Sequence, residues 1–252
     1  MLASLISANV SHLLLAFLPP VFWLLFYLRE DRHPEPKLLL LLSFAGGILT
    51  AILAIFAECL WAVLITGASC TDLSSEAINP LWIFIGISFI EEYAKYLPVK
   101  LLIHRRKDFD EPADAMIYMM TAALGFASLE NAIFSFKIFY GTAQNPLVIL
   151  PFTQTNFLAG LSMAVNRFVG ANLLHALSSG IVGFFLARAW FSPYRHHFLA
   201  LGIILAAVLH TGFNYLILIR ETFSQATFYI IFLLTTMAVM VFIDFERLKK
   251  NN

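Results

Sequence analysis

Long apolar runs separated by short polar stretches occupy most of the chain. Apolar runs of at least about 18 residues are typical of membrane-spanning helices. On this basis the sequence predicts seven spans, at about 8–28, 37–66, 80–103, 113–136, 168–191, 197–219 and 225–245. The run at 147–165 is weaker and contains Pro151, Gln154 and Asn156, so we predict an interfacial or re-entrant segment there. The expected fold is an all-α, polytopic transmembrane helix bundle that forms one integral-membrane domain over residues 1–252.

Composition supports this fold class. Of the 252 residues 60% are hydrophobic and only 13% are charged, and the mean hydropathy is +0.81. A soluble domain of this length does not have such a composition. The expected surroundings are therefore a lipid bilayer, and no nucleic acid is expected as a partner.

Positive residues predict the orientation. Twelve of the sixteen Lys and Arg residues fall in alternate connections and in the carboxyl-terminal tail, at 29–37, 100–112, 188–196 and 247–250. Cytoplasmic loops carry an excess of Lys and Arg. Seven spans with the amino terminus outside and the carboxyl terminus in the cytoplasm fit this distribution, whereas an eighth span would break the alternation.

Ionisable residues inside the spans mark a candidate site. Glu91, Glu92 and Lys95 lie within five residues of one another in the third span. A charge near the bilayer centre costs about 2.5–3.5 kcal/mol, so these residues need partners or a hydrated cavity. The next three spans carry polar groups at overlapping depths, and one cavity could therefore collect Glu130, Asn131, Asn172, His175, His210 and Asn214.

These residue types suit hydrolysis. Lys95 is within helical reach of both Glu91 and Glu92, so one carboxylate can pair with it while the other faces the cavity. A carboxylate there can take a proton from water. The two imidazoles can bind a metal ion or hydrogen-bond the water, and an amide can donate to a developing oxyanion. The pattern HExxH is absent, and Ser178 and Ser179 are expected to serve helix packing.

Several short motifs resemble those of one known family. EEYAK at 91–95 is similar to the EExxK motif of the PrsW family of intramembrane proteases, and GFASLEN at 125–131 resembles its GFxxxEN. His175 in NLLHALSSGIVG, and His210 with Asn214 in LHTGFNYL, resemble its two later histidine motifs. DEPADAM at 110–116 resembles its connecting segment. The motifs keep the family's order, which places the motif-bearing catalytic core at about 80–220.

The resemblance implies a membrane-embedded peptidase related to the CAAX prenyl endopeptidases. Carried over, Glu91 is the base and Glu92 partners Lys95, while the site is completed by Glu130, His175, His210 and Asn214. An FxxxE sequence ending at Glu130 replaces the FxxxH of the prenyl endopeptidases. Zinc is a candidate cofactor, with His175, His210 and Glu130 as its candidate ligands.

The expected function is an intramembrane endopeptidase of the metallo- or glutamate type in a bacterial inner membrane. It is expected to cut a single-span, membrane-anchored protein, such as an anti-sigma factor, toward the extracytoplasmic side. The alternative is a non-catalytic scaffold or a small-solute or proton-coupled carrier, in which the same residues line a through-path or pair off separately. Carriers usually show inverted repeats and broken helices, which this sequence lacks.

Overall fold

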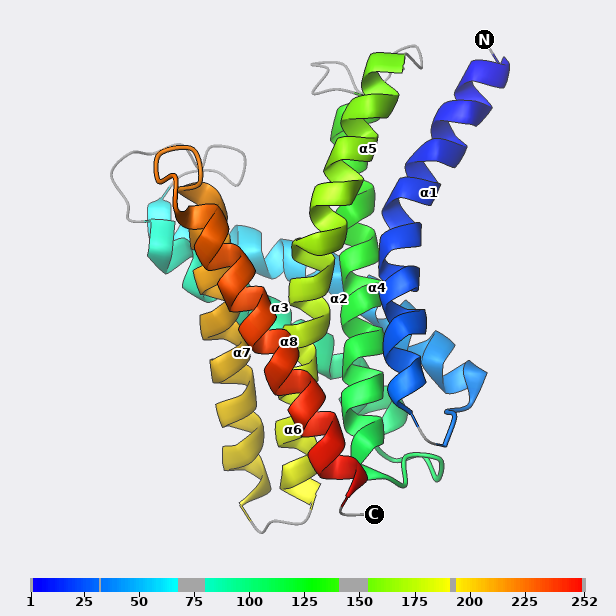
Figure 1. The fold of residues 1–252 in the computed structure, drawn as a ribbon, viewed down its shortest axis with the longest axis vertical. Helices are drawn as coiled ribbons and strands as arrows, with labels where there is room; N and C mark the ends of the chain where they lie inside the picture. Colours follow the sequence, from blue (N-terminus) through cyan, green and yellow to red (C-terminus); the bar gives the residue numbers. More distant parts are fainter. Residues whose placement is uncertain (1, 32, 68–79, 141–153, 191–193, 251–252) are drawn as a thin grey trace.

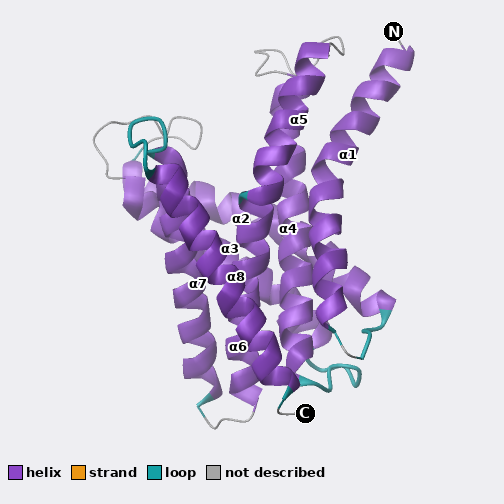
Figure 2. Ribbon diagram, in the orientation of Figure 1, coloured by secondary structure: helices purple, strands orange, loops and turns teal. Residues whose placement is uncertain are grey.

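The chain folds into a bundle of α-helices (Figures 1 and 2). This computed structural model describes residues 2–31, 33–67, 80–140, 154–190 and 194–250. The helices are α1 (Leu2–Tyr27), α2 (Lys37–Thr66), α3 (Pro80–Pro98), α4 (Pro112–Tyr140), α5 (Gln154–Val169), α6 (Ala171–Trp190), α7 (Arg195–Leu218) and α8 (Ala226–Lys249). A 3₁₀ turn, η1 (Leu28–Glu30), follows α1, and a π-helical turn, η2 (Val99–Ile103), follows α3. The described residues contain no β-strand.

The helices confirm the predicted all-α, polytopic bundle. Within the described residues, six segments are long and apolar enough to cross a membrane. Helix α3 is not one of these six, and it carries the three charges Glu91, Glu92 and Lys95. It packs against α2 and α7 and, with η2, spans the predicted range 80–103. Helix α1 begins and α8 ends at opposite ends of the bundle in Figure 1, whereas the orientation relative to the cytoplasm stays a prediction.

The prediction for 147–165 was wrong over the part that the structure describes. Helix α5 continues directly into α6, because Gly170 N–H donates to Asn166 O at 2.9 Å and Leu174 N–H donates to Gly170 O at 2.9 Å. Residues 158–189 therefore form one apolar span rather than a re-entrant segment and a separate helix. Apolar periodicity alone did not reveal this continuity, because polar residues in α5 interrupt the run. Residues 147–153 lie outside the described part.

Helix α4 forms the centre of the bundle. Every residue from Pro112 to Ser128 is buried, and the helix packs against α1, α2 and α6. The helix begins at Pro112, one residue before the predicted range 113–136, and no side-chain hydrogen bond from Asp110 caps it. Instead, the Asp114 carboxylate accepts the backbone N–H groups of Asp110 and Glu111, both at 2.9 Å. These bonds join the two residues before the helix to its first turn.

Two glycines bring the backbones of α2 and α4 into contact. A Cβ on Gly47 would lie 1.9 Å from the Ala122 carbonyl oxygen, and a Cβ on Gly125 would lie 2.0 Å from the Phe44 carbonyl oxygen. Small residues allow this close approach between membrane helices. Helix α2 is continuous from Lys37 to Thr66, and Figure 1 shows it crossing obliquely behind the bundle.

Candidate catalytic and metal-binding site

The charges of α3 form a buried cluster. Lys95 Nζ donates to Glu92 Oε1 at 2.8 Å and to Glu91 Oε2 at 3.3 Å. Lys95 and Glu92 are fully buried, and Glu91 is 4% exposed. The ammonium group therefore contacts both carboxylates, as the helical spacing predicted.

Helices α6 and α7 surround Glu92 with further donors. Ser178 Oγ donates to Glu92 Oε1 at 2.9 Å, and His210 Nδ1 lies 2.8 Å from the same oxygen. Ser179 Oγ donates to Glu92 Oε2 at 3.5 Å. With Lys95, four groups thus donate to this carboxylate, so Glu92 is the carboxylate held in place. The expectation that Ser178 and Ser179 serve only helix packing was therefore wrong, because both hydroxyl groups donate to the Glu92 carboxylate.

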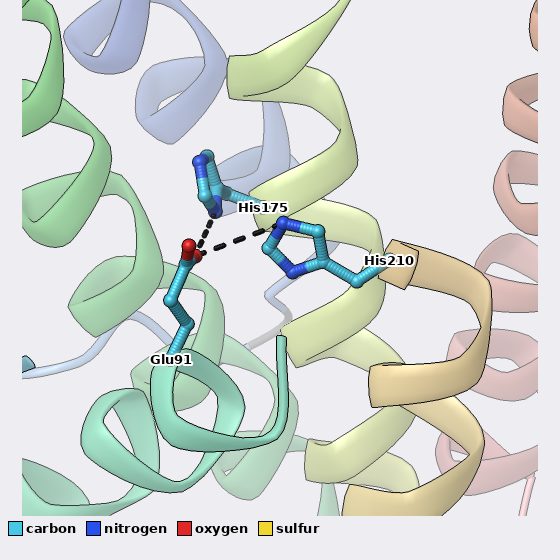
Figure 3. A group of neighbouring side chains, drawn as sticks. All are labelled: Glu91, His175 and His210. Carbon is cyan, nitrogen blue, oxygen red and sulfur yellow. Dashed lines mark ion pairs between the residues drawn. The ribbon is translucent and has the colours of Figure 1, made fainter. Parts of the chain in front are cut away.

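Glu91 faces both histidines. Its Oε2 lies 3.7 Å from His175 Nδ1 and 3.7 Å from His210 Nε2 (Figure 3). The three side chains come from α3, α6 and α7, and all are buried. One ligand atom from each lies within 4.8 Å of the other two.

The ring nitrogens that point away from Glu91 define the histidine tautomers. His210 Nδ1 meets Glu92, and His175 Nε2 lies 2.6 Å from Glu130 Oε2. Because carboxylates only accept hydrogen bonds, these nitrogens carry the protons. The opposite nitrogens, His175 Nδ1 and His210 Nε2, therefore present lone pairs toward Glu91.

This arrangement fits a divalent metal ion. His175 Nδ1 is buried and has no hydrogen-bond partner among the described residues. Two imidazole lone pairs and a carboxylate oxygen that converge without protons repel one another unless a cation or a hydrogen-bond donor lies between them. Two His and one Glu are also a ligand set of catalytic zinc sites. In such sites the second ring nitrogen is commonly held by a carboxylate, which is the relation seen at both histidines.

Glu130 lies on the side of the His175 ring that faces away from Glu91, and it does not contact His210. Its Oε2 contacts His175 Nε2 and also accepts a hydrogen bond from Arg167 Nη2 at 3.0 Å. Arg167 Nε donates to Asn131 Oδ1, and Asn131 Nδ2 donates to Asn172 Oδ1 at 3.0 Å. Polar side chains of α4, α5 and α6 therefore form a hydrogen-bonded network that holds the His175 ring on the side away from Glu91.

The structure brings six of the seven predicted site residues into direct contact. Asn214 is the exception, since it is half-buried one turn beyond His210 and has no side-chain hydrogen bond with the described site residues. Arg167 was missed because it precedes the predicted span 168–191 and was therefore treated as part of a connection. Its position eight residues, about two helical turns, before His175 was the signal that could have placed it on the same helix face.

Comparison with known proteins gives a consistent result. Residues 35–243 match the family described as PrsW family intramembrane metalloprotease. The chain is 29% identical over 220 residues to Protease PrsW of Geobacillus kaustophilus, covering 86% of this chain and 81% of that protein. It is 26% identical over 242 residues to Protease PrsW of Oceanobacillus iheyensis, covering 95% and 96%. No solved structure matches the chain.

These relatives also bear on location. A third relative, Protease PrsW of Clostridioides difficile, is 24% identical over 242 residues, which cover 94% of this chain and 90% of that protein. All three organisms are bacteria, which agrees with the predicted location in a bacterial cytoplasmic membrane. Since the family match covers residues 35–243, the chain belongs to the PrsW family of intramembrane metalloproteases and is an integral-membrane protease.

Proposed function

We propose that the chain hydrolyses a peptide bond of a single-span, membrane-anchored protein at the cluster of Glu91, His175 and His210. The observation that carries this proposal is the convergence of three lone-pair-bearing atoms from three helices at one buried point. A scaffold would need no such convergence. A carrier would place its polar groups along a path, whereas these side chains meet in one cluster.

Glu91 is proposed as the residue that takes the proton from water. It has fewer hydrogen-bond partners than Glu92, and its carboxylate faces both imidazoles. Lys95 contacts this carboxylate, so its charge is balanced in a buried setting. Glu92 has the different task of holding Lys95 and His210 in place.

The same three side chains are proposed to hold a divalent metal ion, with zinc as the expected ion because of the two imidazoles and one carboxylate. Such an ion acts as a Lewis acid toward water and toward a carbonyl group. Glu130, which the sequence suggested as a ligand, is proposed to orient His175 instead. Its contact with the protonated nitrogen directs Nδ1 toward Glu91.

Asn214 is proposed to donate to the oxyanion that develops when the peptide carbonyl is attacked. It is one helical turn from His210, and the described residues provide no hydrogen-bond partner for its amide. Removing one oxyanion donor commonly lowers kcat by about 10²–10³. Asn214→Ala is expected to do so with little change in metal content.

The decisive experiment is Glu91→Gln in full-length protein reconstituted in vesicles with a tagged single-span substrate. Cleavage is expected to be lost while the protein stays folded, and Glu221→Gln at an exposed position is the matched control. The metal content of the Glu91→Gln variant then shows whether Glu91 is also a metal ligand. Retained metal indicates a base alone, whereas lost metal indicates a ligand as well. Normal cleavage by Glu91→Gln would remove Glu91 from the reaction.

The cut is proposed to lie toward the extracytoplasmic side of the substrate span. Glu91 lies eleven residues after Pro80, and His210 lies eight residues before Leu218, both ends being on the predicted outer side. An anti-sigma factor is the proposed kind of substrate. Mass spectrometry of the two fragments locates the cut, and fragments ending in the cytoplasmic half would contradict the cleavage side without affecting the assignment of hydrolysis.

A further inference from the structure

A second site lies away from the catalytic cluster. A cavity of about 630 Å³ opens where α3 passes into η2 and where α6 ends and α7 begins. This is the end of the bundle that carries the basic connections, at the lower edge of Figure 1. None of Glu91, His175 and His210 lines it.

The cavity is basic. Its lining includes Lys100, His104, Arg105 and His196, and no acidic residue is found among the described residues that line it. Lys100 and Arg105 are exposed, and the described residues provide neither with a carboxylate ion-pair partner. Lys100 Nζ instead lies 5.8 Å from the centre of the Tyr96 ring. Two cations at one cavity without a carboxylate favour an anionic ligand.

Local backbone structure positions these cations. Pro98 has no N–H group and ends α3, and the chain continues as a π-helical turn in which His104 N–H donates to Val99 O at 2.9 Å. A Cβ on Gly46 would lie 2.6 Å from Pro98 Cβ, so α2 packs closely against this end. Single π-helical turns occur frequently at functional sites.

The remaining wall is apolar and lies between membrane helices. Leu101 of η2, Leu186 of α6 and Leu199 of α7 line it. Basic sites between transmembrane helices near the cytoplasmic surface suit anionic lipid headgroups. A soluble anion would use the cations but not these leucines.

We propose that this cavity binds the phosphate-bearing headgroup of an anionic phospholipid, with Lys100 and Arg105 contacting the phosphate and an acyl chain lying along the leucines. This site is separate from the proposed hydrolytic reaction. Arg can bind a phosphate through two N–H groups, and Lys contributes a mobile point charge. The proposal therefore concerns a lipid that stays bound to the protein in its membrane.

The test uses full-length protein in neutral detergent, titrated with phosphatidylglycerol, with bound lipid counted by native mass spectrometry. Lys100→Gln with Arg105→Gln is expected to weaken binding about twenty-five-fold, at roughly fivefold per cation. The matched control is Arg106→Gln with Lys107→Gln, which removes the same charge from exposed positions that do not line the cavity. Equal binding by the two double variants would overturn the proposal.

Two further measurements distinguish a bound anionic lipid from free phosphate and from a folding defect. Phosphatidylcholine is expected to bind far more weakly than phosphatidylglycerol, and inorganic phosphate is expected to displace the lipid only at much higher concentration. If phosphate binds as tightly as the lipid, the site is one for free phosphate and the lipid assignment fails. Lys100→Arg with Arg105→Lys keeps both charges and is expected to keep binding, which guards against a folding defect in the Gln variants. Loss of binding in this charge-preserving variant would also refute the proposal.

Discussion

Lys95→Met tests whether the charges of α3 act as one buried network. With an effective dielectric constant of about 20, Lys95 attracts Glu92 across 2.8 Å by about 6 kcal/mol and Glu91 across 3.3 Å by about 5 kcal/mol. Much of this attraction is offset by the dehydration of the ions. Removing one partner of a buried pair therefore destabilises by about 3–5 kcal/mol, since the remaining charge is left buried.

The free energy of unfolding can be measured by titrating sodium dodecyl sulfate into protein in neutral micelles and following circular dichroism. Lys107→Met, at an exposed loop position, is the control and is expected to change stability by no more than about 0.5 kcal/mol. Glu92→Gln combined with Lys95→Met removes both charges and is expected to recover about 1–3 kcal/mol relative to Lys95→Met. A loss below about 1 kcal/mol for Lys95→Met would refute the reasoning, because it would mean that the carboxylates are hydrated or protonated.

Three further predictions concern other parts of the molecule. Glu130→Gln is expected to weaken metal binding about 10–100-fold, because His175 would no longer be held by the carboxylate. Competition with a chromogenic chelator measures the metal affinity, and an unchanged affinity would contradict the orienting role of Glu130. Gly47→Ala is expected to destabilise the protein by about 1–3 kcal/mol, because the added Cβ would meet a backbone carbonyl of α4. Gly212→Ala is the control, since a Cβ there has open space, and equal melting temperatures of the two variants would argue against the close contact between α2 and α4. Burial raises the pKa of Glu35 from 4.5 to about 9. Between these two pH values the folded protein keeps a proton that the unfolded chain releases, so the free energy of unfolding is expected to fall as the pH rises from about 4.5 to about 9. The loss is at most about 1.4 kcal/mol per pH unit, and Glu35→Gln is expected to abolish this part of the slope in unfolding titrations at several pH values.

The sequence predicted the membrane helices well because bilayer thickness limits the length of an apolar run. The predicted ranges 37–66 and 80–103 agree with α2 and with α3 plus η2. The error at α5 has a clear cause. Gln154, Asn156 and Arg167 make this segment polar, and hydropathy could not show that it continues into α6. Two helical hydrogen bonds around Gly170 decide that continuity.

The candidate site was also partly predictable. Charged residues are costly in a membrane, so Glu91, Glu92 and Lys95 stood out without any structure. Helical spacing put Lys95 within reach of both carboxylates but left open which one faces the histidines. The division of labour between Glu91 and Glu92 depends on donors from α6 and α7, which no local pattern reveals.

The sequence by itself determined that the chain is an all-α membrane protein with acids and imidazoles at similar depth in four helices, because apolar length and the cost of buried charge are local properties. Only the tertiary structure decided which atoms meet. It turned His175 Nδ1 and His210 Nε2 toward Glu91, placed Glu130 behind His175, and brought in Arg167. Rotation of each helix about its axis sets these contacts, and that rotation follows from packing between helices rather than from the composition of any one of them.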